Sequence, residues 1–578
     1  ENISGNFINL QEEFESENIA SKFADEYISE YLNEIPNYFS ESKSYNFLYW
    51  DLKKYLSIEI SKYLKAIYLA DKIVEKYNLK DKKIYLEFED IDIKIFNNLK
   101  RKVKCPYRLT VFNLIKLYIR YFYRNIFNIF YILIIPELKF FLCKKKNVIT
   151  KNHFKIGHNI FFDQKFDNWC GSPDFYLKNQ DYDNDDVLFL SNSRINIFDS
   201  KNYRRWVSDL KKSNYHLIDL NNISSFITKK NYLNKIYYKI SDMRFFFFKN
   251  PRILGILNIN CANILSQYMT WLIFFELFSI KYFVTSMIFG ENISNYLQSK
   301  YSNSTNFVYF STSGNLLKKK IYPTKTEFIQ YSFARFDNFF GNKISYKQFL
   351  EWENDFKNFI ETGNLTTPFI LASNKSKILK KLNFKNNKKL VTFFDGTIGK
   401  RGIQSTEGYV EYLKSATYIV NKDNTLNYVF KSKSTFEKIY LTLGKEYSNI
   451  FEILLNNKNI IFFDDKKLLD LDLQSHELIS ASDVCIFTPM SSLAYDALCA
   501  KKSSLIFDPD KIYENNNHVF TMSKLIYSQT QNELYNLLNY WKKDGNLKMN
   551  EISEEIVMPK IDKYSDQESI VRFLSNFK

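Results

Sequence analysis

The sequence lacks the cysteine and histidine patterns that hold disulfide frameworks or structural metal ions. Its 578 residues include six cysteines and five histidines, and the cysteines are scattered without any CxxC spacing. Disulfide scaffolds and structural zinc sites depend on closely spaced or clustered Cys and His residues. The sequence therefore argues against both frameworks and indicates a reducing compartment.

Also missing is any uninterrupted apolar run of about 20 residues, the length that crosses a bilayer. The segment 110–142 is instead rich in aromatic residues, and Lys116, Arg120 and Arg124 recur within it every four positions. That spacing places the cations on one helix face, so the segment predicts a helix that lies in a membrane interface. The alternative is that the aromatic side chains pack against the rest of the protein while the cations face water.

A second apolar stretch, 269–290, carries Glu276 and Lys281 near its middle. A charge at the bilayer centre costs about 2.5–3.5 kcal/mol on insertion scales. We therefore expect a buried or interfacial helix here rather than a membrane span.

The chain also has no internal repeat, no GxGxxG or Walker A spacing and no recognised nucleic-acid-binding module. Its formal net charge of +16 predicts attraction to polyanions, and nucleic acid, anionic lipid and nucleotide-sugars all fit that charge. The basic residues are spread along the whole chain rather than gathered into one stripe, which disfavours nucleic acid. Partners that carry phosphate are therefore expected.

What the chain does contain is an alternation of short apolar strands with helical segments, in two blocks. Strands are predicted at 187–191, 215–220 and 307–310 before a helical tract at 346–360, and then at 390–394, 427–430 and 460–463. Such alternation builds a parallel sheet with helices on both faces, so we predict an α/β protein with two Rossmann-like domains. The predicted divisions are a helical N-terminal region with the amphipathic segment (1–150), a first domain with inserted apolar helices (151–365) and a second domain (388–578).

The stretch 475–509 shows this pattern most clearly. A short helix leads into an apolar strand at 484–487, a tight turn follows, and Ser491 and Ser492 occupy the N-cap position of a helix that runs to Ala500 before another strand at 504–507. The free N–H groups and positive dipole end of such a helix attract an anion such as a diphosphate. The alternative is that the two serines only cap the helix.

The amino-acid sequence of this unit resembles that of the donor-binding half of GT-B glycosyltransferases, in particular bacterial enzymes that build capsule, O-antigen and related surface polysaccharides. The resemblance covers roughly the last third of the chain, and its residues are Ser482-Asp483-Val484, Ser491-Ser492, Asp496-Ala497-Leu498 and Phe507-Asp508-Pro509. One departure is Lys501-Lys502-Ser503, where the family usually has Gly-Lys-Pro. The resemblance implies a GT-B fold, a nucleotide-sugar as substrate, no cofactor and no essential metal.

Candidate donor-binding residues come from three places in the second domain. A glycine-rich basic loop follows the strand 390–394, and glycines there let a backbone approach a ligand while cations neutralise phosphate. The resemblance adds a basic residue at the end of the next strand, and it assigns Asp496 to a ribose or sugar hydroxyl, with a solvent-facing position as the alternative. The full set is Gly396, Gly399, Lys400, Arg401, Lys431, Lys433, Ser491, Ser492 and Asp496.

The catalytic base is expected in the first domain. The stretch 158–176 reads as a loop dense in functional side chains, so His158, Asp163, Asp167 and Asp174 are the candidates. DxD-like pairs at Asp183/Asp185, Asp470/Asp472 and Asp508/Asp510 raise a metal-dependent GT-A alternative. The two α/β blocks favour GT-B, and no metal site is predicted.

Together these features predict a glycosyltransferase at the cytoplasmic face of the cell membrane. It would move a sugar from a nucleotide-sugar to a lipid-linked or growing cell-surface glycan, as in capsule or lipopolysaccharide synthesis, and would contact an anionic membrane surface. Two alternatives stay open. One is a polyol-phosphate transferase of teichoic-acid type with a CDP donor, and the other is a non-enzymatic basic protein that binds nucleic acid or membranes.

Overall fold

The computed structural model describes the two sheet regions and parts of the N-terminal region. Its continuous ranges are 106–133, 151–160, 183–191, 215–220, 261–285, 302–309, 335–351, 355–384, 388–396, 404–489, 491–513, 518–564 and 568–577, with isolated positions elsewhere. Asp163, Asp167, Asp174, Gly399, Lys400 and Arg401 lie outside the described residues.

The first sheet has seven strands, and every pairing within it is parallel. Its strands are β3 (His153–Ile160), β4 (Val187–Ser191), β5 (His216–Asp219), β6 (Ser279–Thr285), β7 (Thr305–Tyr309), β8 (Arg335–Gly341) and β9 (Asp355–Glu361). Their order is β5-β4-β3-β6-β7-β8-β9. Strands buried on both faces need apolar side chains throughout, and Val187 to Leu190 of β4 are all buried.

The second sheet has six strands, again all parallel. They are β10 (Leu390–Phe394), β11 (Asn427–Lys431), β12 (Ile460–Phe463), β13 (Val484–Phe487), β14 (Ser504–Phe507) and β15 (Tyr527–Ser528), in the order β12-β11-β10-β13-β14-β15. Helices α15 (Thr406–Lys422), α16 (Phe436–Leu455), α18 (Ser475–Ala481), α19 (Ser492–Cys499) and α20 (Gln531–Ile552) connect or follow these strands. Their apolar residues form one large core with the sheet.

Each sheet reverses its strand order once, as doubly wound sheets do. The chain starts in the middle of the sheet, at β3 or β10, builds outward to one side and then crosses back to add β6 or β13 on the other side. At such a reversal the loops after the two central strands diverge to opposite faces, so ligands bind at the carboxyl ends of these strands. The reversal points are β3/β6 in the first domain and β10/β13 in the second.

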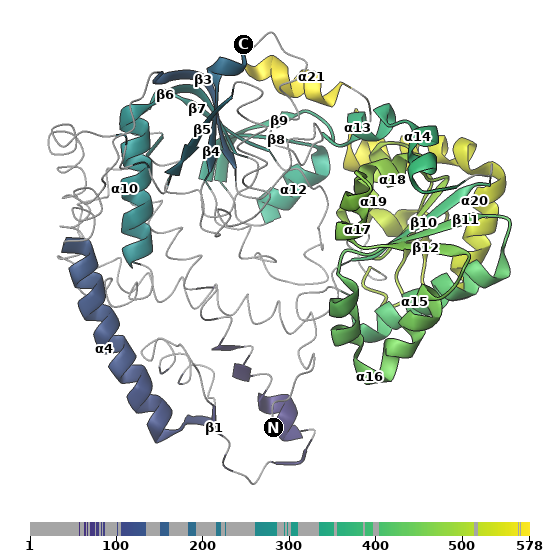
Figure 1. Cartoon of the computed structure of the whole chain (residues 1–578), viewed down its shortest axis with the longest axis horizontal. Helices are drawn as coiled ribbons and strands as arrows, with labels where there is room; N and C mark the ends of the chain where they lie inside the picture. Colours follow the sequence, from purple (N-terminus) through teal and green to yellow (C-terminus); the bar gives the residue numbers. More distant parts are fainter. Residues whose placement is uncertain are drawn as a thin grey trace.

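The end of the chain returns from the second domain to the first. Helix α21 (Ser569–Leu574) and the turn after it pack into the core of the first sheet, where the rings of Phe573 and Phe340 are 4.7 Å apart and those of Phe577 and Phe307 are 5.1 Å apart. Figure 1 shows α21, in yellow, beside the first sheet while the rest of the second domain lies to the right. The predicted α/β class, with two Rossmann-like domains in a GT-B arrangement, is confirmed.

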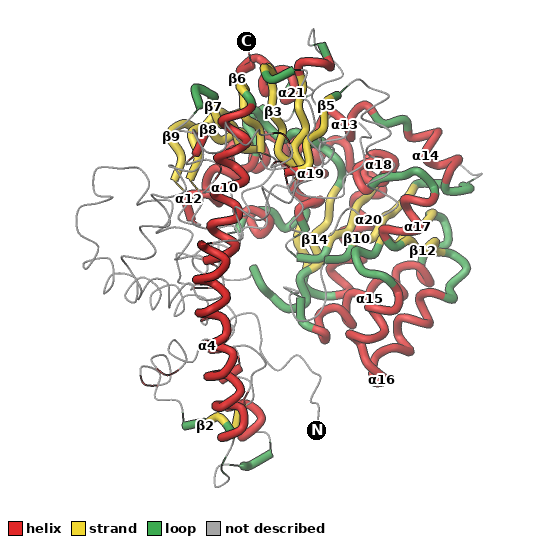
Figure 2. Tube along the Cα trace, turned by 60° about the vertical axis from the view of Figure 1, so that its left-hand side comes forward, coloured by secondary structure: helices red, strands yellow, loops and turns green. Residues whose placement is uncertain are grey.

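Helix α4 (Val111–Leu133) confirms the helix predicted within 110–142. It packs against α10 (Cys261–Leu277), and its buried side carries Asn113 and Leu117. Figure 2 shows α4 extending away from both sheets. None of the helices in the described part of the chain has the length and apolar character needed to cross a bilayer.

Three predicted segments have a different structure. The stretch 269–290 is not one helix, because α10 ends at Leu277 and β6 begins at Ser279, with the Lys281 side chain exposed on the strand. The tract 346–360 divides into α12 (Lys343–Glu351) and β9. The loop predicted from His158 onward is wrong at its start, because His158 belongs to β3. The first two errors arise because an apolar run does not by itself distinguish a helix from a strand. The third arises because a buried strand carries polar residues near its end.

Candidate functional site

The reversal point of the second sheet brings two short loops together. Asp395 and Gly396 follow β10, Thr488 follows β13, and the Thr488 N–H donates to the carbonyl oxygen of Phe394 at 3.2 Å. A Cβ atom built on Gly396 would lie 2.9 Å from Thr488 Oγ1, closer than real side chains approach. Glycine at 396 therefore allows the two loops to meet at the carboxyl edge of the sheet.

Asp395 is the buried acid of this edge. Its carboxylate accepts hydrogen bonds from the Tyr409 hydroxyl at 2.9 Å, the Ser432 hydroxyl at 2.8 Å and the Lys433 backbone N–H at 2.6 Å. Burial raises the pKa of Asp395 to about 6, and these hydrogen bonds and the Lys431 charge limit the rise. Asp395 therefore fixes the loop after β11 against the end of β10 and can exchange a proton near neutral pH.

The two lysines predicted to contact a diphosphate have different environments. Lys431 is the last residue of β11, pairs in register with Phe394 and is 5% exposed. Lys433 has an exposed side chain, and its backbone N–H holds Asp395. Lys431 ends the strand next to β10, at the same carboxyl edge of the sheet, so it is the better placed of the two to neutralise an anion there.

The N-terminus of α19 completes this side of the edge. Ser491 is its N-cap in extended conformation, its hydroxyl makes no capping hydrogen bond, and Ser492 opens the helix. Three residues earlier, Thr488 Oγ1 is fully buried and has no hydrogen-bond partner among the described residues. Buried hydroxyls are normally paired, so the Thr488 hydroxyl, three residues before the N-cap of α19, is an exception among the described residues.

A further contact joins the start of α15 to the loop after β14. Asp510 accepts from the Ser405 N–H at 2.9 Å and from the Ser405 hydroxyl at 2.5 Å, while Asp508 accepts from the N–H groups of Ile512 and Tyr513. The carboxylates of this DxD-like pair are thus engaged with protein donors. Within the described residues no group of three or more His, Cys, Asp or Glu side chains is placed to hold a metal ion.

Asp496 lies deeper than either predicted role implies. It is 3% exposed, so the solvent-facing alternative is wrong, and its Oδ1 accepts from Asn364 Nδ2 at 2.8 Å. Asn364 belongs to the connection between the two domains, 132 positions earlier in the chain. The donor-binding role of Asp496 stays a prediction, and its observed partner is the interdomain connection.

In the first domain the reversal point carries buried polar side chains. His158 and Asn159 lie just before the last residue of β3, Thr285 ends β6, and Asn159 and Thr285 are neighbours in register. The His158 ring is fully buried, with its centroid 5.7 Å from that of Phe189 and 6.0 Å from that of Tyr309. The aspartates proposed as bases follow β3 in sequence, outside the described residues.

The structure therefore brings Gly396, Lys431 and Lys433 to one edge with the serines that open α19. The residues that sequence analysis missed are Asp395, Thr488 and Asn364. A polar residue directly after a buried central strand was the signal available for Asp395 and Thr488. No local pattern points to Asn364, because its partners are distant in sequence.

Two Rossmann-like domains, each with one reversal of strand order, define a protein with the GT-B fold. The family model described as polysaccharide biosynthesis PFTS motif protein matches residues 246–538, and the chain belongs to this family. The prediction of a protein of polysaccharide biosynthesis is thereby confirmed at the level of the family. No curated protein matches the chain in sequence.

Several solved structures resemble the chain at low identity. A glycosyltransferase from Rickettsia africae is 11% identical with a TM-score of 0.38, and the match covers 74% of this chain and 98% of that one. The UDP-GlcNAc 2-epimerase from Neisseria meningitidis bound to UDP-GlcNAc is 11% identical with a TM-score of 0.40, and the match covers 73% of this chain and 99% of that one. The wall teichoic acid polymerase TagF is 11% identical with a TM-score of 0.38, and the match covers 79% of this chain and 97% of that one. The fold assignment rests on the two sheets themselves.

Proposed function

We propose that the protein is a glycosyltransferase that moves a sugar from a nucleotide-sugar to a lipid-linked or growing cell-surface glycan, of the capsule or O-antigen type. One observation carries the proposal, namely the edge between β10 and β13. There Gly396 lets the loops after β10 and β13 meet, Thr488 keeps a buried hydroxyl without a partner among the described residues, and α19 begins at Ser492, four residues after Thr488. An edge with these three properties suits the diphosphate of a nucleotide-sugar.

The chemistry that this edge would supply is stabilisation of the leaving nucleotide. As the bond between the sugar and the diphosphate breaks, negative charge grows on the phosphate oxygens, and N–H groups at a helix N-terminus and a nearby cation stabilise it. The N–H groups of α19 and the Lys431 ammonium group fill these roles without an essential metal. Gly399, Lys400 and Arg401 belong to the same loop in sequence and are proposed to extend the contact.

The acceptor hydroxyl needs a base, which we place in the first domain. The candidates lie at or after the carboxyl end of β3 in sequence, and β3 is one of the two strands at the reversal point of that sheet. They are His158, Asp163, Asp167 and Asp174. Substrates bind at this end of parallel strands. The buried His158 ring is suited to orient the end of β3, and the aspartates after it are the proposed proton acceptors.

We further propose that the protein works at the cytoplasmic face of the cell membrane. Its helix α4 exposes a continuous apolar stripe, as large apolar side chains from Val111 to Ile126 are between 49% and 77% exposed. At about 100° per residue these positions fall within roughly 140° of the helix circumference. Lys116 and Arg120, both exposed, lie directly beside that stripe, an arrangement that favours an anionic lipid surface over water or neutral lipid.

The proposed activity is tested by incubating the full chain with a panel of UDP-, CDP- and GDP-sugars, a lipid-linked glycan acceptor and a chelator. We expect release of a nucleoside diphosphate from at least one donor, at the same rate with and without the chelator. Release of a nucleoside monophosphate from a CDP-polyol would instead establish polyol-phosphate transfer, because that reaction breaks the diphosphate linkage. No release from any donor, together with salt-dependent binding of nucleic acid, would contradict an enzymatic function.

A further inference from the structure

The chain passes from the first domain to the second after β9, and this first connection between the domains is held by one residue, Asn364. Its backbone N–H donates to Asp562 Oδ2 at 2.7 Å, and its Nδ2 donates to Asp496 Oδ1 at 2.8 Å. Its Oδ1 accepts from the N–H groups of Thr366 at 2.8 Å and Thr367 at 3.2 Å, at the start of α13 (Thr367–Ala372). Asn364 is 5% exposed, so each of these bonds is made away from water.

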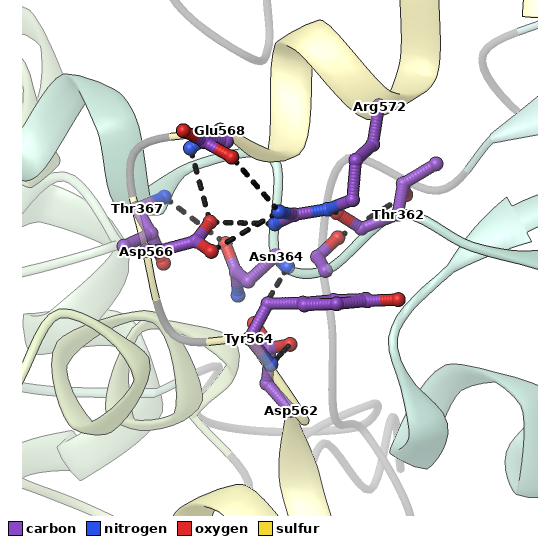
Figure 3. Close-up of polar contacts among 9 residues, drawn as sticks. Thr362, Asn364, Thr367, Asp562, Tyr564, Asp566, Glu568 and Arg572 are labelled. Atoms are coloured by element: carbon purple, nitrogen blue, oxygen red, sulfur yellow. Dashed lines mark hydrogen bonds and ion pairs between the residues drawn. The ribbon is translucent and has the colours of Figure 1, made fainter. Parts of the chain in front are cut away.

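The second connection is bound to the first. Arg572 on α21 donates through Nε to the Thr362 carbonyl oxygen at 2.9 Å and through both terminal nitrogens to Asp566 at 3.0 and 2.5 Å. Its guanidinium carbon lies 3.8 Å from the centre of the Tyr564 ring. Figure 3 shows Arg572 between Asp566 and Thr362, with Tyr564 along its other side.

Glycine is required between these two attachments. Gly363 has a φ of +89°, and a Cβ on it would lie 3.2 Å from the Arg572 guanidinium and 3.3 Å from Asp562 Oδ1. A side chain at 363 would therefore be strained and would press on both connections. The two passages between the domains thus form one packed unit, and Asn364 joins that unit to α19.

We propose that Asn364 and Asp496 are a positioning pair, which holds α19 at a fixed place relative to the interdomain connection. Asp496 lies in the middle of α19, so its hydrogen bond to Asn364 fixes the helix whose N-terminus forms the donor edge. In this proposal the carboxylate acts on the donor through the position of α19, and this role replaces the direct donor contact that the resemblance implied for Asp496. This inference rests on the proposed function, because it takes the nucleotide diphosphate as the ligand of that edge.

The surroundings of Asp496 explain why a carboxamide occupies position 364. Burial and the nearby carboxylates of Asp562 and Asp496 raise the pKa of the Cys499 thiol well above its usual value. The buried Asp496 carboxylate needs a side-chain donor, and the N–H groups of Thr366 and Thr367 need an acceptor at the same place. Asparagine provides both, whereas aspartate at 364 would keep the acceptor and lose the donor.

The experiment exchanges the two groups. We compare Asn364→Asp, Asp496→Asn and the double variant, measuring the Kd for UDP, CDP and GDP by calorimetry and the Tm in parallel. Asn364→Asp sets a carboxylate against Asp496, and we expect the Kd of the tightest nucleotide to weaken about tenfold. Asp496→Asn keeps an acceptor for Asn364 and stays within about twofold of wild type. The double variant restores one donor and one acceptor, so its affinity returns to within about twofold of wild type.

A matched control is Asn342→Asp. Asn342 is also a buried residue that precedes a helix, α12, and its Oδ1 accepts from the Ser345 N–H and hydroxyl. A carboxylate keeps these acceptor roles, so the Kd is expected to stay unchanged in this variant. A change in Asn364→Asp alone would then come from the pair and not from a new buried charge before a helix.

Two results overturn the positioning role. A double variant that binds as weakly as Asn364→Asp, with Asp496→Asn equally weak, would mean that the Asp496 carboxylate itself contacts the donor. An unchanged Kd in Asn364→Asp with a lowered Tm would mean that the bond only stabilises the fold. A wild-type protein that binds none of the three nucleotides would contradict the proposed function first, and would leave the pair with no site to position.

Discussion

Replacing Lys431 with methionine is expected to weaken the binding of a nucleoside diphosphate by about ten- to a hundredfold. Methionine preserves the length and apolar stem of the buried side chain and removes only the charge. Hydrogen bonds to charged groups contribute about 1.5–3 kcal/mol, which corresponds to this range of affinity. The measurement is a calorimetric titration of wild type and Lys431→Met with the nucleotide that the wild type binds most tightly.

The same substitution changes the pH dependence of stability through Asp395. The Lys431 charge lowers the pKa of Asp395, so its removal raises that pKa above its present value of about 6. A carboxyl whose pKa is higher in the folded state than in the unfolded state stabilises the fold at low pH and loses that contribution as pH rises through the folded-state value. The Tm of Lys431→Met relative to wild type should therefore fall as the pH rises above about 6.

Lys433→Met is the matched control for both effects. The Lys433 side chain is exposed, and its contact with Asp395 is made by the backbone N–H, which the substitution keeps. We expect less than about a threefold change in Kd, in line with an exposed charge. Equal losses in the two variants would show a diffuse attraction by surface charge. An unchanged Kd in a folded Lys431→Met protein would remove this lysine from the donor site.

The second large effect concerns the membrane. Replacing Phe112, Ile119 and Phe122 with serine is expected to reduce partitioning onto anionic vesicles by more than about tenfold, because each side chain loses about 1–2 kcal/mol of apolar burial. All three side chains are at least half exposed, so the fold should persist. The measurement is co-sedimentation with vesicles of phosphatidylcholine alone or mixed with phosphatidylglycerol.

A charge variant and an apolar control separate the electrostatic from the apolar contribution to vesicle binding. Lys116→Gln with Arg120→Gln should lower binding only to the vesicles that contain phosphatidylglycerol. The control replaces three other exposed apolar residues, Leu441, Ile453 and Val571, with serine and should bind as wild type does. If the α4 variant binds vesicles normally but no longer self-associates in sedimentation velocity, the stripe is an interface between two copies and the membrane proposal is wrong.

Local patterns in the sequence predicted most of the second domain. Strands β10, β11, β12, β13 and β14 are short runs of apolar residues bounded by turns, and buried parallel strands require that composition. The helix from Ser492 followed from two hydroxyl residues after a strand. These features depend on neighbours in the chain, so one sequence suffices to recognise them.

Other features depend on tertiary contacts. His158 and Asn159 looked like loop residues, yet they lie within the last three residues of β3, the central strand of the first sheet, beside its reversal point. From the sequence, Asp496 was interpreted as a donor contact or a surface residue, because its partner Asn364 lies 132 positions away in the connection between the domains. Thr488 was only part of a turn until its hydroxyl proved to be buried. Burial and distant pairing decide these roles, and neither has a local signature.

Hydrogen exchange of the wild-type protein, with and without the nucleoside diphosphate it binds, tests the central claim most directly. The account predicts that protection from exchange appears in the backbone N–H groups that follow β10, β11 and β13, including those that open α19. Protection confined to other parts of the molecule, in the presence of demonstrated binding, would show that the diphosphate does not occupy this edge.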